Sequence, residues 1–490
     1  MRILYLDLDT LRPDHLGCYG YHRPTSPNLD WIASQGVRFD NYYCSDAPCL
    51  PSRAALISGR FGIHNGVINH GGVCADRPPD GSDRSFRDSF AGGGSLFNVL
   101  RDAGLRTAYV GGFGERHSAY WWYAGFHEVF DTARGGMESA EEVTPAALDW
   151  IRRNASSDNW FLHVNYWDPH TPYRAPASFG NPFAGEPLPA WLTPGVFAGH
   201  RNHVGPHGAW EINMFNDAVN PRYPRHPGRV SDMDGVRQVI DGYDCGIRYM
   251  DDHIGQLLDA LRQTGALDDL VILVSSDHGE NLGELGIFGE HATADHITCR
   301  IPMLVRWPGV AAPGRVDRGL HANVDLVPTL AEMFNRPARF AWDGRSFAQT
   351  ILAGADTGRP DLVLSQCCHV CQRSARWDRW LYLRTWHDGY HLFPQEMVFD
   401  LAADPHEQHD LASERPDLCR EGAWRLLRWH DEMMAGMPAG RTADPMQVVL
   451  DEGGPFHARG SLRPYCDRLE ATGRGWAVPE LKRRHPREFV

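Results

Sequence analysis

The sequence predicts an α/β fold, in which a mostly parallel central sheet is flanked by helices and followed by a smaller α+β domain with an antiparallel sheet. Two observations support this prediction. Short apolar runs typical of buried strands alternate with helical segments in the first part of the chain, which favours a parallel sheet. After about residue 365 this alternation gives way to two strands and one helix. We therefore expect a large α/β domain at residues 1–365 and a C-terminal subdomain with its tail at residues 366–490.

Two of the apolar runs lead into acidic residues. Residues 3–8 form one predicted strand, with Asp9 where it should end, and residues 270–274 form another that leads into Asp277 and His278. Both runs are almost continuously apolar, as expected of strands that are buried on both faces. Ligands of open α/β sheets bind at the carboxyl ends of the strands, so we expect these polar residues to face one crevice.

Helices are expected between the strands. Ser26 and Pro27 are typical of a helix start, and so are Thr144 and Pro145. Apolar residues recur at three- and four-residue spacing over residues 247–261, which predicts a third helix. Two shorter strands are predicted at residues 107–110 and 160–164.

Two later regions differ from this pattern. Residues 174–233 are rich in Pro, Gly, His and aromatic residues and show no periodicity. We expect them to form substrate-specificity loops, with a tolerated surface insertion as the alternative. In the C-terminal part, strands are expected at residues 381–386 and 397–401 and a helix from Pro416, while the basic run at residues 481–485 is interpreted as a solvated tail.

The composition limits the partners and the location of the protein. The 48 Lys and Arg residues against 62 Asp and Glu residues give a net charge of −14, which argues against nucleic acid or an anionic membrane as a partner. No apolar stretch approaches the roughly 20 residues of a membrane span. Asp7 and Asp9 interrupt the first apolar run before it could serve as a signal peptide. We expect a cytoplasmic protein whose 11 cysteines are reduced.

The acidic residues at the strand ends predict a metal site. Two carboxylates and a histidine can hold a divalent cation, which cancels charge on a bound anion and polarises its oxygens. Asp9, Asp277 and His278 are the candidate ligands. Each of them alone would be more typical of a helix cap or a turn.

The most informative segment surrounds Cys49. Pro51 suits the first turn of a helix and Gly59 its end, so Cys49 should lie near the helix N-terminus. The helix dipole favours negative charge there, and Arg53 can reinforce that effect. Judged by composition alone, a small buried cysteine would be an equally good interpretation.

The complete motif around Cys49 favours a reactive cysteine over a merely buried one. Cys-x-Pro-Ser-Arg followed by Ala-Leu-Ile-Ser-Gly-Arg, at residues 49–60, resembles the signature of the type I, formylglycine-dependent sulfatases of the alkaline phosphatase superfamily. Further segments are similar to strings of that family, and they lie at residues 9–20, 168–173, 277–280, 343–344 and 399–407. The resemblance implies a central sheet with helices on both faces and a smaller C-terminal domain.

The resemblance also implies a mechanism. Cys49 would be oxidised to formylglycine by a formylglycine-generating enzyme, and a hydroxyl of the hydrated aldehyde would attack the sulfur of a sulfate ester. Loss of the alcohol would leave a sulfated enzyme, and deprotonation of the remaining hydroxyl would expel sulfate. Arg53 would contact the anion, His170 would contact the leaving oxygen or a sulfate oxygen, and His117 or His291 would act as acid or base.

Three departures from the family pattern affect these roles. Thr10 stands where many sulfatases have a second aspartate, and it is the fourth candidate of the metal site. It offers a neutral oxygen or none, so the cation loses one anionic ligand. Ca²⁺ is the cation that the family implies, with Mn²⁺ or Mg²⁺ as alternatives. Arg116 and His117 would replace a family lysine and histidine from a shifted position. His291 would replace another lysine, which would make activity more sensitive to pH near neutrality.

The resulting hypothesis is hydrolysis of a small anionic ester, namely a sulfated sugar or an aryl sulfate. The main alternative is hydrolysis of phosphonate monoesters or phosphodiesters. A two-metal phosphatase using Thr10, Asp295 and His296, and a binding protein without activity, are further alternatives. Residues 367–371 lack the paired spacing of common zinc sites. Long aromatic loops and the C-terminal tail are compatible with a homo-oligomer.

Overall fold

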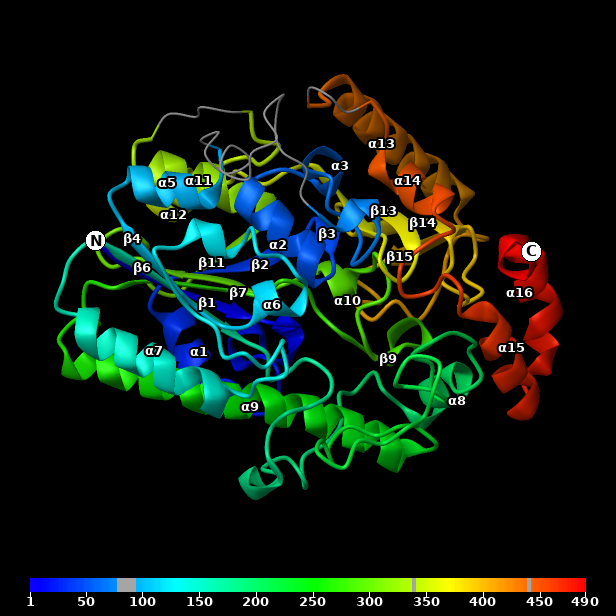
Figure 1. Ribbon diagram of the computed structural model, residues 1–490. Helices are drawn as coiled ribbons and strands as arrows, with labels where there is room; N and C mark the ends of the chain where they lie inside the picture. The colour runs from blue at the N-terminus through cyan, green and yellow to red at the C-terminus, as the bar shows by residue number, and fades with distance from the viewer. Residues whose placement is uncertain (77–93, 337–340, 439–441) are drawn as a thin grey trace.

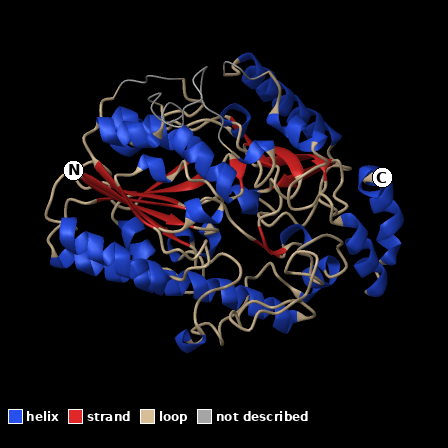
Figure 2. Cartoon of the chain, viewed as in Figure 1, coloured by secondary structure: helices blue, strands red, loops and turns tan. Residues whose placement is uncertain are grey.

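A computed structural model describes residues 1–76, 94–336, 341–438 and 442–490 (Figure 1). Its centre is an eight-stranded sheet with the strand order β11-β2-β10-β7-β1-β6-β4-β5. Helices cover both faces, with α2, α5 and α11 on one side and α1, α7 and α9 on the other (Figures 1 and 2). The prediction of a mostly parallel sheet between helices is confirmed.

The strand register sets the position of the acidic residues. β1 (Arg2–Leu8) lies between β6 (Trp160–Tyr166) and β7 (Val271–Ser275) and is parallel to both, with Ile3 opposite Phe161 and Val271. β10 runs antiparallel to its neighbours β7 and β2. The remaining strands of the sheet are β2 (Val37–Tyr43), β4 (Arg106–Val110), β5 (Glu128–Phe130), β10 (Met303–Arg306) and β11 (Arg315–Ala322).

The long helices begin at well-capped positions. α9 (Met233–Gln263) starts after Asp232, whose side chain accepts a hydrogen bond from the Gly235 N–H, and it is much longer than the predicted segment. α7 (Ala140–Asn154) begins before Thr144, where the sequence predicted its start. The earlier start follows from Ser139 and Glu142, which form a reciprocal capping box.

A second, five-stranded sheet lies beside the first. Its order is β15-β14-β13-β12-β3, and all pairs are antiparallel except β12 with β3. α13 (Pro416–Ala435) packs on it, as predicted (Figure 1). Because β3 continues into α2 (Cys49–Ser58), this sheet is connected to the segment that carries Cys49. The strands are β3 (Asp46–Ala47), β12 (Asp361–Gln366), β13 (Cys371–Trp377), β14 (Trp380–His387) and β15 (Glu396–Asp400).

The predicted loop region contains few regular elements. Residues 174–233 hold α8 (Pro194–His200) and one short 3-10 turn before α9 begins. The basic run near the C-terminus, by contrast, is not a free tail, because it belongs to a helix whose Leu481 is buried. The other elements are α1 (Pro27–Ser34), α3 (Gly62–Asn65), α5 (Leu96–Asp102), α6 (Phe113–Arg116), β8 (Asn281–Leu282), β9 (Phe288–Glu290), α10 (His296–Cys299), α11 (Leu326–Met333), α12 (Ala348–Ala353), α14 (Pro445–Asp451), α15 (Leu462–Ala471) and α16 (Val478–Arg484).

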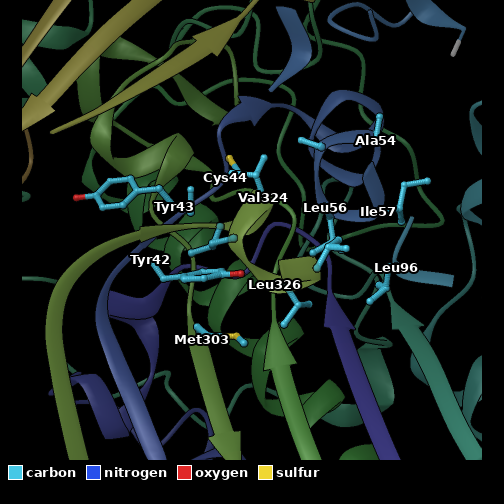
Figure 3. Close-up of a cluster of buried hydrophobic side chains, with 14 of the residues drawn as sticks. Tyr42, Tyr43, Cys44, Ala54, Leu56, Ile57, Leu96, Met303, Val324 and Leu326 are labelled. Atoms are coloured by element: carbon cyan, nitrogen blue, oxygen red, sulfur yellow. The ribbon is translucent and has the colours of Figure 1, made fainter. Parts of the chain in front are cut away.

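A large apolar core fixes α2 against the central sheet. Leu56 and Ile57 of α2 belong to one buried cluster with Tyr42 of β2, Met303 of β10 and Leu326 of α11 (Figure 3). Burial of side chains of this size stabilises the packing by about 1.5–3 kcal/mol each. The helix that begins at Cys49 is therefore held rigidly over the strand ends. None of the helices in the described ranges has the length and apolar character needed to span a bilayer.

Candidate active site

The two acidic strand ends and the start of α2 meet in one buried site. Asp9 follows β1, Asp277 and His278 follow β7, and Cys49 is the first residue of α2. A ligand atom from each of these four residues lies within 4.8 Å of those of the other three, and all four side chains are buried. The sequence-based expectation that the strand ends face one crevice agrees with this geometry.

Arg53 lies among three carboxylates. Its Nε and Nη2 donate to the two oxygens of Asp7 at 2.9 and 3.0 Å, and its Nη1 donates to Asp277 Oδ2. Nη2 is also 3.0 Å from Asp9 Oδ2. The guanidinium is fully buried, with the Phe113 ring centroid 4.8 Å away. Arg53 therefore balances part of the negative charge and fixes the carboxylates in place.

The donor set fits a divalent cation. Both carboxylate oxygens of Asp9 are buried without a hydrogen bond of good geometry, and the ion pair of Oδ2 with Arg53 leaves Oδ1 without a partner at hydrogen-bond distance. Asp277 Oδ1 accepts hydrogen bonds from the backbone N–H groups of Thr10 at 3.1 Å and His278 at 3.0 Å. A buried carboxylate without a hydrogen-bond donor is costly, so a cation at this point would satisfy Asp9. The Thr10 hydroxyl instead donates to the Asp9 carbonyl oxygen at 2.8 Å.

His278 is oriented as a neutral ligand. Its Nδ1 lies 2.8 Å from the Gly279 carbonyl oxygen, so Nδ1 carries the hydrogen and Nε2 keeps its lone pair. Nε2 is 3.0 Å from Cys49 Sγ and 3.3 Å from Asp277 Oδ2. Burial lowers the pKa of His278 to about 3, which keeps the ring uncharged at neutral pH.

The Cys49 thiol is held in its neutral form. Burial raises the pKa of Cys49 well above its usual value, and the carboxylates of Asp9 and Asp277 raise it further. Arg53 opposes this effect without overcoming it. The favourable helix N-terminus expected from the sequence is thus outweighed by burial and by negative neighbours. Cys49 is therefore not set up to act as a thiolate nucleophile.

The predicted histidines line the same site. His170 Nε2 is 4.0 Å from Asp9 Oδ1, and the His291 ring centroid is 4.0 Å from that of His278 and 5.2 Å from that of His170. His117 groups with Cys49 and His70, with ligand atoms within 4.8 Å of one another. The nine candidate residues of the sequence analysis thus come together, whereas the neighbouring Arg116 is exposed.

Other charged residues of the site escaped the sequence analysis. Asp7 lies on β1, two positions before Asp9, and residues with this spacing in an extended chain share a face. The strand pattern therefore held a signal for Asp7. Glu290 Oε1 lies 2.8 Å from His291 Nε2 and orients that ring. The sequence offered no comparable signal for Glu290, since its partners other than the adjacent His291 come from distant segments.

The ligands suggested for a two-metal phosphatase have other roles. Asp295 caps α10 by accepting from the Thr298 N–H, and its second oxygen accepts from the Asn281 side chain at 2.9 Å. His296 Nδ1 is 3.0 Å from the Tyr43 hydroxyl. Neither residue belongs to a potential metal-binding group within the described ranges. This geometry does not favour that alternative.

Comparison with solved structures extends the description of the fold. A phosphonate monoester hydrolase of Agrobacterium radiobacter superposes with a TM-score of 0.69 at 18% identity, over 88% of this chain and 95% of its own. A protein solved with its substrate D-glucosamine-2-N,6-O-disulfate superposes with a TM-score of 0.70 at 18% identity, over 90% and 99% of the two chains. Both superpositions show a shared fold, in which a mostly parallel sheet lies between helices and a second, antiparallel sheet lies beside it.

Sequence comparison gives the family. The model of the family described as Sulfatase matches residues 2–335. Choline-sulfatase of Rhizobium meliloti (strain 1021) is 26% identical over 437 residues, covering 79% of this chain and 77% of the relative. The multifunctional alkaline phosphatase superfamily protein PehA of Trinickia caryophylli is 26% identical over 483 residues, covering 82% and 89%. The chain belongs to the sulfatase family and is a sulfuric ester hydrolase.

Proposed function

We propose that the protein hydrolyses a small sulfate ester with a formylglycine derived from Cys49 and one divalent cation. The observation that carries this proposal is the position of Cys49 Sγ among ligand atoms of Asp9, Asp277 and His278. These three side chains would hold the cation next to residue 49. When bound, the cation would reduce the charge of the substrate's anionic group and polarise its oxygens. Ca²⁺ is the proposed ion, and Mn²⁺ or Mg²⁺ are the alternatives.

The protein's own side chains have distinct parts in this reaction. As a hydrated aldehyde, residue 49 would supply the hydroxyl that attacks sulfur. Arg53 fixes the carboxylates in place and would add positive charge beside the anion. His170 would donate a hydrogen bond to a sulfate or leaving-group oxygen, while His291 and His117 would accept or return the proton of the nucleophile. Thr10 contributes through its backbone N–H, which fixes Asp277.

The substrate we propose is a sulfated mono- or oligosaccharide or an aryl sulfate. Residues 174–233 would form part of its pocket, and a formylglycine-generating enzyme would be the partner needed for maturation. Phosphonate monoester or phosphodiester hydrolysis is the second candidate, and the superposition with a phosphonate monoester hydrolase favours testing it. Both substrate classes present a tetrahedral anion to one cation, so the site geometry discriminates poorly between them.

The first test is the mass of one tryptic peptide. Cleavage after Arg38 and Arg53 releases residues 39–53, which contain Cys44 and Cys49. In protein produced together with a formylglycine-generating enzyme, we expect residue 49 to exchange CH₂SH for an aldehyde while Cys44 keeps its thiol. Fragmentation locates the change. Two intact thiols in catalytically active protein would contradict the proposed nucleophile.

The second test separates the two substrate classes. We expect a higher kcat/KM on an aryl sulfate than on the matching aryl phosphonate, measured with the same leaving group. A large preference for the phosphonate would favour the second candidate. Cys49→Ala is expected to abolish turnover of both esters, and Cys44→Ala is the matched control. Full turnover by Cys49→Ala would exclude residue 49 as the nucleophile.

A further inference from the structure

A second cluster of metal-ligand side chains surrounds Glu290, at the end of β9. Glu290 is buried, and its Oε1 lies 2.8 Å from His291 Nε2 and 3.0 Å from the His291 backbone nitrogen. Its other oxygen, Oε2, lies 3.0 Å from His207 Nε2. One carboxylate oxygen is therefore occupied by hydrogen bonds from His291, and the other faces a different ring.

The His207 ring presents a lone pair to that oxygen. His207 Nδ1 is 3.0 Å from the Ile212 carbonyl oxygen, which can only accept, so Nδ1 carries the hydrogen. His207 Nε2 is buried and makes no hydrogen bond. Burial lowers the pKa of His207, which favours the neutral ring. Two electron-rich atoms then face each other in the interior, an arrangement that a cation would stabilise.

A third ligand comes from the segment between β12 and β13. His369 is buried, and its Nε2 lies 3.8 Å from Glu290 Oε1. One ligand atom each from His207, Glu290 and His369 lies within 4.8 Å of the others. The three residues come from three separate segments of the chain, so their convergence is a property of the tertiary fold.

We infer that His207, Glu290 and His369 form a second metal site, which takes a divalent transition metal of the Zn²⁺ class. Two imidazoles and one carboxylate form a donor set that suits Zn²⁺ and related ions better than Ca²⁺. Three protein ligands leave a coordination position open, as in zinc sites that bind water or a substrate oxygen. This site is separate from the cation site proposed at Asp9 and Asp277, since the two share no ligand.

The surrounding hydrogen bonds hold the three ligands in place. The Phe288 N–H donates to the His207 carbonyl oxygen at 2.9 Å, which ties His207 to the strand that carries Glu290. Gln366 accepts from the His369 N–H at 3.1 Å and donates to the His291 carbonyl oxygen at 3.0 Å. Contact of His207 Nδ1 with a backbone carbonyl is the outer-shell support common to metal-binding histidines.

The second site lies beside the proposed active site. His291 connects them, because it contacts Glu290 on one side and its ring centroid lies 4.0 Å from that of His278. An ion held by Glu290 would thus sit one side chain away from the residues around Cys49. Its open position would offer an anchor for an oxygen of the substrate outside the sulfate group.

The test is a Zn²⁺ titration of metal-free, full-length protein. We expect two bound equivalents in the wild type by calorimetry and by metal analysis after gel filtration. His207→Ala and His369→Ala should each bind one equivalent fewer. Asp277→Asn should keep this equivalent and lose only the one bound at the proposed active site. His203→Ala is the matched control, since His203 is exposed, lies in the same loop and should leave both equivalents in place.

A spectroscopic readout keeps the inference testable without activity. Co²⁺ bound by two histidines and a carboxylate should give visible absorption that His207→Ala and His369→Ala lose and that Asp277→Asn retains. If circular dichroism shows that the alanine variants are unfolded, Glu290→Gln is used in their place, because it preserves the size of the side chain. A zinc stoichiometry in folded His207→Ala, His369→Ala or Glu290→Gln protein that equals that of the wild type would overturn the assignment.

Discussion

Arg53 shows how one residue makes a concentration of negative charge tolerable in the interior. Asp7, Asp9 and Asp277 carry three carboxylates around its single guanidinium, and all four side chains are buried. Removing such groups from water costs several kcal/mol each, and only close pairing offsets that cost. A planar, permanently charged fork can pair with several carboxylates at once, whereas an ammonium acts as a point charge.

This geometry predicts a large effect of Arg53→Lys. We expect kcat/KM for an aryl sulfate to fall by roughly 100- to 1,000-fold, the range typical of losing one well-placed electrostatic contact. Lysine cannot bridge the same carboxylates, so their positions around the cation would change. Initial rates at saturating cation measure the effect. Arg152→Lys, on the exposed side of α7, is the control, and a loss of less than threefold in Arg53→Lys would contradict the role assigned here.

At the scale of elements, the sequence predicted those site residues that lie at strand ends or in a local motif. Asp9 and Asp277 were found because apolar runs lead into them, and Cys49 and Arg53 because they share one short string. His207 and His369 belong to irregular segments without periodicity, and only the fold brings them to Glu290. Long-range convergence of loops leaves no local pattern, so these residues could not have been predicted.

Gly279, in the loop after β7, lies too close to α10 to tolerate a side chain. A Cβ at this position would lie 2.1 Å from the Ile297 carbonyl oxygen, while the Gly279 N–H donates to the Thr298 carbonyl oxygen at 2.7 Å. Gly279→Ala should therefore push the loop away from α10 and reduce the free energy of unfolding by about 1–3 kcal/mol. Urea denaturation measures it. Gly199→Ala, where a Cβ meets nothing within 4 Å, should change little, and equal effects would refute the steric argument.

The contacts of Asp388 with the C-terminal helix α16 should make the stability of the fold depend on pH. Asp388 accepts from His485 Nε2 and from Arg484 Nη1, both at 2.8 Å, and so anchors α16. Burial alone would raise the pKa of Asp388, but the contacts with His485 and His387 lower it to about 2. A carboxyl group with a depressed pKa stabilises the fold above its unfolded pKa, and this stabilisation is lost as the pH falls through the folded pKa.

Because the pKa of Asp388 is lowered to about 2, Asp388→Asn should cost on the order of 2 kcal/mol of stability at pH 7. The difference from the wild type should shrink as the pH falls from about 4 towards 2. Urea denaturation at pH 7, 4 and 3 tests this, with the exposed Asp467→Asn as the control. A difference that stayed constant over this range would show that Asp388 does not titrate as described.

For the molecule as a whole, charge distribution bears on the class of substrate. The net charge of −14 repels polyanions at long range, so a long sulfated polymer would approach against the field. The positive and neutral donors of the site, Arg53 and the surrounding histidines, act only over short distances in a buried crevice. A small anionic ester carries fewer charges than a polymer and is repelled less on its way to such a site. This argument supports the substrate class proposed above.

The acidic site joins β1, β7 and α2, so a cation bound at the proposed position would stabilise the whole fold. Without a cation, the carboxylates around Arg53 outnumber its charge and repel one another across these elements. A bound ion stabilises the fold by about 2.7 kcal/mol when its concentration is one hundred times Kd.

We expect a chelator to lower the Tm of the wild type and Ca²⁺ or Mn²⁺ to restore it. Asp9→Asn should show a much smaller change, since it loses a ligand and one repelling charge together. His207→Ala keeps all the ligands of this site, so its Tm should respond to Ca²⁺ as that of the wild type does. If chelation left the Tm of the wild type unchanged, the strand ends would be stable without an ion.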